Sequence, residues 1–165
     1  TVMTNLGFRL AMRAEGIDVV ETAVGDRYVL EALAAGGFSL GGEHSGHVIF
    51  ADHATTGDGI LTAVALLDAV RRSGRPLAEL AGDAMTSLPQ VLVNVRVARR
   101  LPDVAERLAD EIAAAERELG GTGRILVRAS GTEPLVRVMV EAPTQDQAQS
   151  VANSVAAAAR LLPDT

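Results

Sequence analysis

Two short apolar segments separated by a turn place the strongest constraint on how this chain folds. Residues 125–127 precede the turn, and residues 135–141 follow it with valine at every second position. Such alternation is typical of a β-strand with one buried face and one exposed face. The intervening residues 129–134 include Ser, Gly, Thr and Pro, which do not continue a strand. The sequence therefore predicts a β-hairpin with strands at 124–128 and 135–141.

The predicted turn carries the chemical groups that an oxyanion binds. Arg128 supplies a planar, permanently charged guanidinium, and Ser130 and Thr132 supply hydroxyls. Gly131 allows backbone N–H groups to approach a ligand closely, and Arg137 adds a further positive charge on the second strand. These residues are typical of a phosphate-binding loop. The same composition also suits an ordinary hairpin turn whose Ser and Thr cap backbone groups, so both interpretations stand at this point.

Composition and charge narrow the class of protein. The chain has 165 residues, no cysteine, 48% hydrophobic residues and a formal net charge of −6. It can therefore bury a substantial core, but it can form neither disulfides nor thiolate metal sites. The net negative charge argues against general nucleic-acid binding. No apolar run reaches membrane-spanning length and no signal-peptide pattern is present, so we expect no nucleic-acid partner, no membrane association and a cytoplasmic location.

The order of the predicted elements indicates two domains. Residues 1–82 alternate helices and strands, which indicates an α/β partial domain with a mixed sheet and flanking helices. Residues 83–165 follow the order β-α-β-β-α, which predicts a small α+β domain whose antiparallel sheet carries two helices on one face. A linker is expected between residues 82 and 89. Because the first three residues look like the end of a strand, we expect the first domain to be truncated at its N-terminus. In the first domain the expected helices lie at 8–15, 26–36, 59–72 and 77–81, and the expected strands at 17–24 and 48–50.

Three helices carry distinctive signals in the sequence. The helix expected at 59–72 is apolar nearly all round, which predicts burial on most of its sides. Asp103 with Glu106, and Thr144 with Gln147, have the spacing of a capping box. Each pair predicts the start of one of the two helices in the second domain.

A second cluster of polar residues lies in the Gly-rich segment 41–47. Glu43, Ser45 and His47 are spaced by two, so in an extended segment their side chains face the same way. A carboxylate, a hydroxyl and an imidazole in one row suit the neighbouring hydroxyls of a sugar. One alternative is a turn whose polar groups bond only to the local backbone. Another is a metal site formed by His44, His47 and His53, which lacks a supporting carboxylate cluster.

Three further residues have both a structural and a functional interpretation. Asp58 directly precedes a predicted helix, so N-capping is favoured over metal binding. Arg27 lies in the first turn of another predicted helix, where it either reaches a ligand phosphate or remains solvated. Ser130 is expected to bind an anion and not to act as a nucleophile, because no His lies in the second half of the chain to activate it.

Taken together, five segments resemble the α-D-phosphohexomutases. They are TVMTNLGF at 1–8, VGDRYV at 24–29, GGEHSGHVIF at 41–50, TTGDGILTA at 55–63 and RASGTEPLVRVMVEA at 128–142. The segments span nearly the whole chain in the order that the family has. The first, second and fourth are similar to the branch of the family that acts on glucosamine phosphates.

The resemblance implies a four-domain parent enzyme, of which this chain supplies most of the third domain and the fourth domain. In that family the loop matching residues 43–47 binds sugar hydroxyls, and the loop matching residues 128–132 binds the phosphate that does not react. The parent is then expected to interconvert glucosamine 6-phosphate and glucosamine 1-phosphate through a bisphosphate. This isomerase activity supplies amino-sugar precursors of UDP-N-acetylglucosamine and peptidoglycan.

The resemblance also implies what this chain lacks. Family members use a phosphoserine that exchanges its phosphoryl group with the sugar, and an Asp-rich loop that holds Mg²⁺; neither loop occurs in the sequence. We therefore expect no catalytic residue and no metal site in these residues, and we expect the chain alone to be inactive. Its expected partners are a phosphosugar and the N-terminal domains of the same parent chain, which would hold the Mg²⁺. The alternatives are a phosphomannomutase or phosphoglucomutase of the same family, or a non-catalytic module that binds sugar phosphates.

Overall fold

The chain forms two compact units, each with its own hydrophobic core. A computed structural model describes residues 1–163. The first unit is Thr1–Ser87 and the second is Leu88–Thr165. This division falls within the linker expected between residues 82 and 89, although residues 82–84 still belong to helix α4 (Leu77–Ala84).

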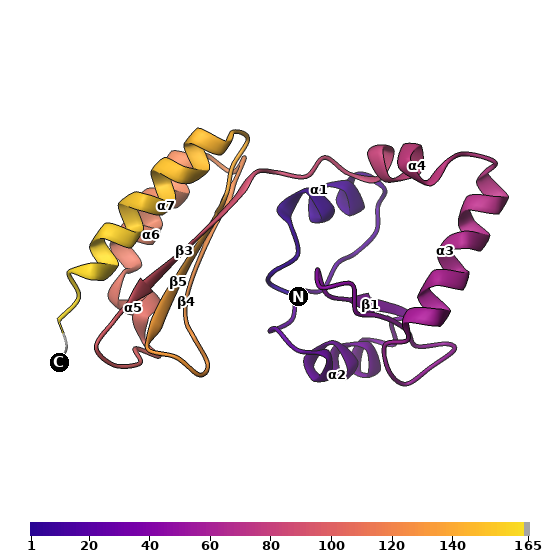
Figure 1. The fold of residues 1–165 in the computed structure, drawn as a ribbon, viewed down its shortest axis with the longest axis horizontal. Coiled ribbons are helices and arrows are strands. Elements are labelled where there is room, and N and C mark those ends of the chain that lie inside the picture. Colours follow the sequence, from indigo (N-terminus) through magenta and orange to yellow (C-terminus); the bar gives the residue numbers. More distant parts are fainter. Residues whose placement is uncertain (164–165) are drawn as a thin grey trace. The chain divides into compact units, whose positions relative to one another are not determined.

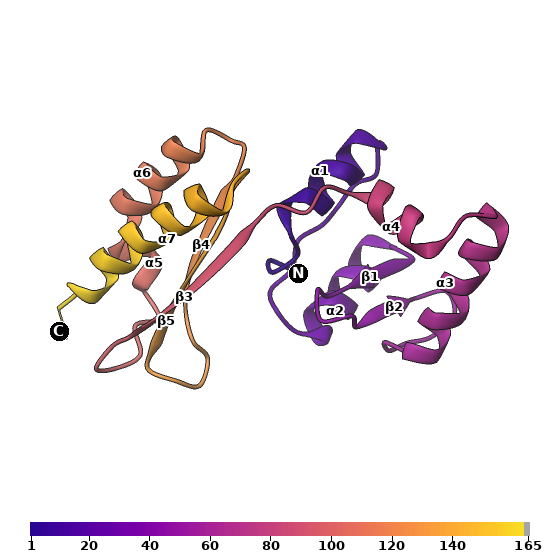
Figure 2. The ribbon, with the colours of Figure 1, turned by 45° about the horizontal axis from the view of Figure 1, so that its top comes forward.

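The first unit combines helices with a short antiparallel hairpin (Figures 1 and 2). Strand β1 pairs with β2, with Gly41 opposite Ile49. Val29 and Leu33 of α2 pack on Ile49, which is fully buried. This packing holds the turn between β1 and β2, residues 43–47, at one end of the hairpin. The elements are α1 (Leu6–Ala14), α2 (Asp26–Gly36), β1 (Leu40–Gly42), β2 (Val48–Phe50), α3 (Gly59–Ser73) and α4 (Leu77–Ala84).

The strand expected at 17–24 does not form. The β-branched residues typical of a strand are present, but a strand also needs a neighbour with which to form a ladder. The segment is tied to the start of the chain by a backbone bond from the Val2 N–H to the Thr22 oxygen at 2.8 Å, and no strand forms there. Ile17, Val19 and Val20 consequently remain exposed.

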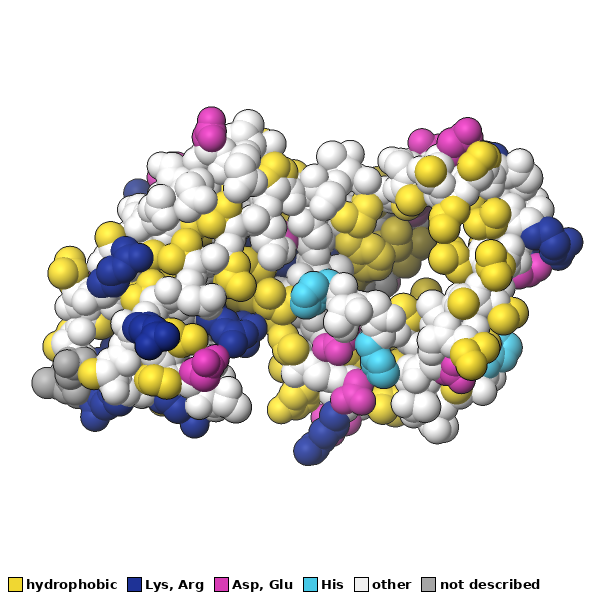
Figure 3. Space-filling view, viewed as in Figure 1, with side chains coloured by type: hydrophobic (Ala, Val, Ile, Leu, Met, Phe, Trp, Pro, Cys, Tyr) yellow, Lys and Arg dark blue, Asp and Glu magenta, His cyan; other side chains and the backbone are white. Residues whose placement is uncertain are grey.

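Helix α3 is far more exposed than its sequence predicts. None of its residues is buried, and Ile60, Val64 and Leu67 keep 79%, 60% and 65% of their surface exposed. Figure 3 shows hydrophobic side chains gathered along this helix. The prediction of burial on most sides is wrong here, because α3 packs on β2 and its other faces meet no neighbouring layer among the described residues of the first unit.

The second unit is the small α+β domain that the sequence predicts. Its three strands form an antiparallel sheet in the order β3-β5-β4, and α5, α6 and α7 cover one face (Figures 1 and 2). The alternating residues Val136, Val138 and Val140 of the central strand are fully buried against these helices. The elements are β3 (Gln90–Arg96), α5 (Val104–Arg107), α6 (Ala109–Leu119), β4 (Arg124–Ala129), β5 (Leu135–Glu141) and α7 (Gln145–Arg160).

The N-cap bond of one of the two predicted capping boxes forms. The Thr144 side chain accepts a hydrogen bond from the Gln147 N–H at 3.3 Å and caps α7. Asp103 makes no such bond, because its carboxylate binds the Arg107 side chain at 2.8 Å instead. The helix expected after Asp103 is also interrupted at Leu108, where α5 ends and α6 begins.

A buried ion pair lies on the sheet face opposite the helices. Arg124 of β4 and Glu141 of β5 are directly opposite in the register, and Arg124 Nε lies 2.7 Å from Glu141 Oε2. A second contact joins Arg124 Nη2 to Glu141 Oε1 at 3.3 Å. The Glu141 side chain is fully buried and Arg124 is 14% exposed. Sequence patterning did not indicate this pair.

Candidate functional site

Two arginines face each other across the hairpin formed by β4 and β5. Arg128 is the Cα partner of Arg137, so both side chains leave the sheet on the same face. Burial lowers the pKa of Arg128, and the positive charge of Arg137 lowers that pKa further. Like charges placed directly opposite destabilise a sheet by roughly 0.2–1 kcal/mol. An anion bound between the two guanidiniums would remove this repulsion.

The Arg137 side chain is also incompletely satisfied. Its Nε atom is buried and has no hydrogen-bond partner. Its Nη2 atom forms an ion pair with Glu133 Oε2 at 3.7 Å, and the Glu133 side chain is 57% exposed. A buried donor without a partner costs about 1–3 kcal/mol. The guanidinium of Arg137 is therefore suited to donate hydrogen bonds to an anionic ligand.

The loop between the two strands closes tightly at its base and is open at its tip. The Ser130 N–H donates to the Leu135 oxygen at 2.8 Å, and Ser130 is 1% exposed. Gly131 and Thr132 are exposed, and no atom beyond the chain neighbours of Gly131 lies within 4 Å of the position that a Cβ would take there. The structure thus leaves Gly131 and Thr132 open to a ligand and places Ser130 in the base of the loop.

The order of the strands adds a third arginine to this face of the sheet. Asn94 of β3 is the partner of Arg137, and Arg96 lies two residues further along β3 on the same face. The Val97 N–H bonds to the Pro134 oxygen at 3.1 Å, which ties this end of β3 to the loop. Sequence reasoning missed Arg96, because the pairing of β3 with β5 was not specified by the pattern of either strand.

The segment 43–47 forms a hairpin turn between β1 and β2. The Glu43 N–H donates to the His47 oxygen at 2.9 Å, and the Gly46 N–H donates to the Glu43 oxygen at 3.0 Å. The extended row expected for Glu43, Ser45 and His47 is therefore wrong: the first and last flank the turn, and Ser45 lies exposed at its tip. All three still belong to the one short loop between β1 and β2.

The carboxylate of Glu43 is fixed by the start of helix α2. Its Oε1 atom accepts a hydrogen bond from the Gly25 N–H at 2.9 Å. Gly25 has a φ of 130°, a backbone conformation that favours glycine. This contact brings the segment VGDRYV onto the loop 43–47. The sequence contains both segments, but it did not reveal that they meet.

The other candidate residues have structural roles. Asp58 caps α3, and its Oδ1 atom accepts from the Ile60 and Leu61 N–H groups at 2.8 and 3.0 Å. Arg27 forms an exposed ion pair with Glu31 one turn along α2 at 2.7 Å. The hydrogen bond from Arg27 to Glu31 raises the pKa of Arg27. The solvated interpretation of Arg27 therefore has direct support, and the phosphate interpretation has none in the structure.

The described residues contain no group of three or more His, Cys, Asp or Glu that could hold a metal ion. The alternative in which His44, His47 and His53 share a metal is therefore not supported. Within the same part of the chain, no helix is long and apolar enough to cross a membrane.

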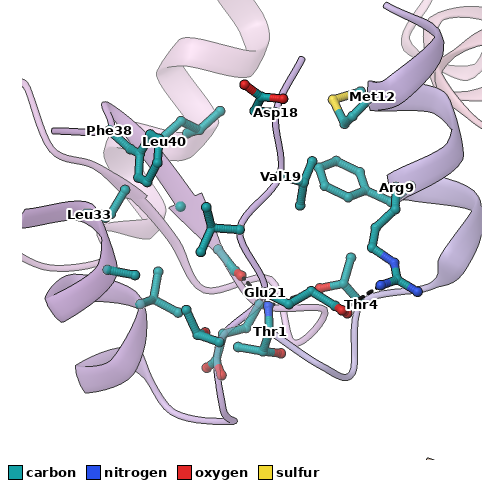
Figure 4. A pocket seen from close by; sticks show the side chains of 18 of the residues that line it. Thr1, Thr4, Arg9, Met12, Asp18, Val19, Glu21, Leu33, Phe38 and Leu40 are labelled. Carbon is teal, nitrogen blue, oxygen red and sulfur yellow. Dashed lines mark hydrogen bonds and ion pairs between the residues drawn. The ribbon is translucent and has the colours of Figure 1, made fainter. Parts of the chain in front are cut away.

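A largely apolar cavity of about 450 Å³ lies in the first unit (Figure 4). Met12 of α1, Val19, and Phe38 and Leu40 near β1 point into it. Glu43 also lines the cavity, whereas Ser45 and His47 do not. Sequence reasoning missed this cavity, because residues 17–22, which form part of its wall, were expected to belong to a strand at 17–24.

Family models match both units of the chain. The model described as phosphoglucomutase/phosphomannomutase, alpha/beta/alpha domain III, matches residues 1–88. The model described as phosphoglucomutase/phosphomannomutase, C-terminal domain, matches residues 92–158.

Curated proteins with closely similar sequences are named phosphoglucosamine mutase. The protein of Thermobifida fusca is 62% identical over 157 residues, which are 94% of this chain and 35% of that protein. The protein of Frankia alni is 63% identical over 161 residues, which are 97% of this chain and 35% of that protein. The chain thus spans about a third of the length of these relatives.

Solved structures share the fold. One is N-acetylphosphoglucosamine mutase of Aspergillus fumigatus in complex with GlcNAc-6P and magnesium, with a TM-score of 0.75 and 24% identity over 97% of this chain and 40% of that chain. Another is an N-acetylglucosamine-phosphate mutase of the α-D-phosphohexomutase superfamily in a product complex. Its TM-score is 0.77, with 25% identity over 96% of this chain and 37% of that chain.

Proposed function

Since the chain belongs to the phosphoglucomutase/phosphomannomutase family, we propose that it is the C-terminal part of an enzyme that interconverts glucosamine 6-phosphate and glucosamine 1-phosphate. Relatives of about 60% identity that carry the name phosphoglucosamine mutase support this substrate over mannose or glucose phosphates. In this proposal the reaction passes through a bisphosphate, and the parent is a cytoplasmic isomerase of amino-sugar metabolism.

The observation that carries the proposal is the pair of opposed guanidiniums beside an open loop. Arg128 and Arg137 share one face of the sheet, and the buried Nε of Arg137 lacks a partner. Planar guanidiniums bind phosphate oxygens through paired hydrogen bonds. Gly131 and Thr132 would add a backbone N–H and a hydroxyl from the exposed side of the loop. We assign this loop to the phosphate that does not react.

The turn at 43–47 is the proposed site for the sugar. The carboxylate of Glu43, already held at one oxygen by the Gly25 N–H, accepts a further bond from a sugar hydroxyl through its second oxygen. Ser45 at the exposed tip both donates and accepts. His47, on the other flank of the turn, completes the group.

A second phosphate site has a direct use in this reaction. The bisphosphate must present either end of the sugar to one phosphoryl donor, so the remaining phosphate needs a place to bind in both orientations. Binding energy gathered there lowers the barrier at the reacting end. We assign the donor serine and the Mg²⁺ site to the N-terminal domains of the parent, as the resemblance to the family implies. The chain alone is accordingly expected to bind a phosphosugar and not to turn it over.

The test compares Arg128→Ala with Arg117→Ala in the full-length parent enzyme. Arg117 is a matched control, because it lies in the same unit and its side chain bonds only to the backbone of its own helix in the structure. Removing a charged hydrogen bond costs about 1.5–3 kcal/mol, which is about 10- to 150-fold in affinity. We expect that loss in phosphosugar binding for Arg128→Ala and none for Arg117→Ala. Unchanged KM and kcat in Arg128→Ala would refute the phosphate role, and mutase turnover by the 165-residue chain would refute the assignment of the donor.

A further inference from the structure

The segment TTGDG has no role in the proposed chemistry beyond capping α3, yet its first glycine meets the loop that is assigned to the sugar. The polar edge of the His47 imidazole lies directly against the Cα of Gly57. A methyl group at Gly57 would lie 2.7 Å from His47 Nδ1 and closer still to Cε1 and Nε2. Real side chains do not approach so closely, so only glycine leaves room for the ring at this place.

We infer that Gly57 is a positioning residue that seats the His47 side chain in the sugar loop. The inference rests on the proposed function of residues 43–47 and extends it to a segment 10 residues further along the chain. Gly57 does not touch the sugar; it provides the backbone surface on which the imidazole lies. His47 Nε2 is buried and has no hydrogen-bond partner, so the ring is held by contact with this surface and not by a bond of that nitrogen.

The backbone is anchored on both sides of the contact between Gly57 and the His47 imidazole. Asp58, the next residue, caps α3 with two hydrogen bonds, and its oxygen also accepts from the Thr62 hydroxyl at 2.7 Å. On the other side, the His47 backbone closes the turn through the Glu43 N–H. The backbone on each side is therefore anchored, and the movable part is the imidazole.

A larger residue at 57 would consequently displace the ring and leave the fold intact. The atoms that it would meet belong to the end of a flexible side chain, which rotates away at low cost. A rotated imidazole can no longer lie beside the turn where Glu43 and Ser45 are held. Gly57→Ala is therefore expected to mimic the loss of the imidazole without removing it.

Gly59→Ala provides a matched control. Gly59 lies two residues away, is the first residue of α3, and has no atom within 4 Å of the position that a methyl group would take. A single sugar hydrogen bond is worth about 0.5–1.5 kcal/mol, so Gly57→Ala should raise the dissociation constant for glucosamine 6-phosphate about 2- to 10-fold. Gly59→Ala should leave it unchanged.

Two measurements distinguish a loss of His47 positioning from general damage to the loop. In the 165-residue chain without ligand, the Cε1–H signal of His47 should move in Gly57→Ala, while those of His44 and His53 stay in place. In the full-length parent, Gly57→Ala should weaken glucosamine 6-phosphate binding in the wild-type background and have no further effect in a His47→Ala background. An unmoved His47 signal, or losses that add in the double variant, would overturn the inference.

The same experiments distinguish this inference from the function on which it rests. If the wild-type parent fails to bind glucosamine 6-phosphate, the proposed function fails. The positioning of His47 by Gly57 then has no role in sugar binding. If the parent binds the phosphosugar and the two losses add, only the role of Gly57 is refuted.

Discussion

The ion pair of Arg124 and Glu141 makes the stability of the second unit depend on one buried carboxylate. Glu141→Gln keeps the size of the side chain and removes its charge. Breaking a buried ion pair by changing one partner costs about 3–5 kcal/mol, because the other charge stays in a poorly solvated place. Arg124 retains 14% of its exposure and the amide still accepts one hydrogen bond, so we expect the lower end, about 3 kcal/mol.

Such a loss is large for a unit of this size. At about 0.05–0.15 kcal/mol per residue, the unit Leu88–Thr165 has about 4–12 kcal/mol of stability in total. The measurement is amide hydrogen exchange at Val138 and Val140, which lie in the buried central strand and report on opening of this unit alone. Protection at these amides should fall about 100-fold, at 1.4 kcal/mol for each factor of ten.

Glu133→Gln is the matched control for Glu141→Gln. Glu133 belongs to the same hairpin and pairs with Arg137 at 3.7 Å, but its side chain is 57% exposed. Exposed pairs contribute about 0–1 kcal/mol, so protection at the central strand should hardly change. A double variant, Arg124→Met with Glu141→Leu, should recover most of the lost protection, because no charge is then left buried. Equal protection in Glu141→Gln and Glu133→Gln would refute the argument.

Three further changes test other contacts. Arg137→Gln should leave the unliganded chain at least as stable in urea as the wild type, because it removes the repulsion with Arg128. The same change should weaken phosphosugar binding in the parent. A destabilised chain would contradict this reasoning. Thr144→Ala should lower the free energy of unfolding of the second unit by about 1 kcal/mol through loss of the helix cap, and an unchanged urea midpoint would show that the cap contributes nothing. The hydrogen bond from Arg107 lowers the pKa of Asp103 from 3.8. The contribution of this pair to the free energy of unfolding is therefore present above that pH and is lost as the pH falls below it. The difference in urea midpoint between the wild-type chain and Asp103→Asn should therefore shrink as the pH drops below 3.8, and a constant difference would count against the pair.

Local patterns predicted the second unit well, because its structure is set by signals close together in the sequence. The alternation at 135–141 and the Ser-Gly-Thr-Pro turn were sufficient to predict β4, β5 and the loop between them. The pairing of Arg128 with Arg137 follows from that hairpin. The position of β3 beside β5 does not, because a strand pattern specifies its two faces and not its neighbour.

The first unit was predicted less well. Its apolar segments indicate burial, but the described residues of the unit provide no neighbouring layer on which these segments could pack. The apolar residues at 17–24 and the apolar sides of α3 are correct signals for burial, but neither meets a partner layer there. The sugar loop shows a different limit. A spacing of two places side chains on one face only in extended backbone, and the bond from the Glu43 N–H to the His47 oxygen bends this segment into a turn.

The central place of β5 also determines where the chain tolerates insertions. One residue added within β5 would shift its register with β3 and β4 at once, which would turn Arg137 toward the helices and Val138 toward the opposite face. A residue added at Gly131, where no atoms crowd the backbone, would leave both registers unchanged. The sheet therefore tolerates a longer tip, but a longer tip would displace Gly131 and Thr132 from the proposed phosphate site. The spacing between the arginines and the core is fixed by the register.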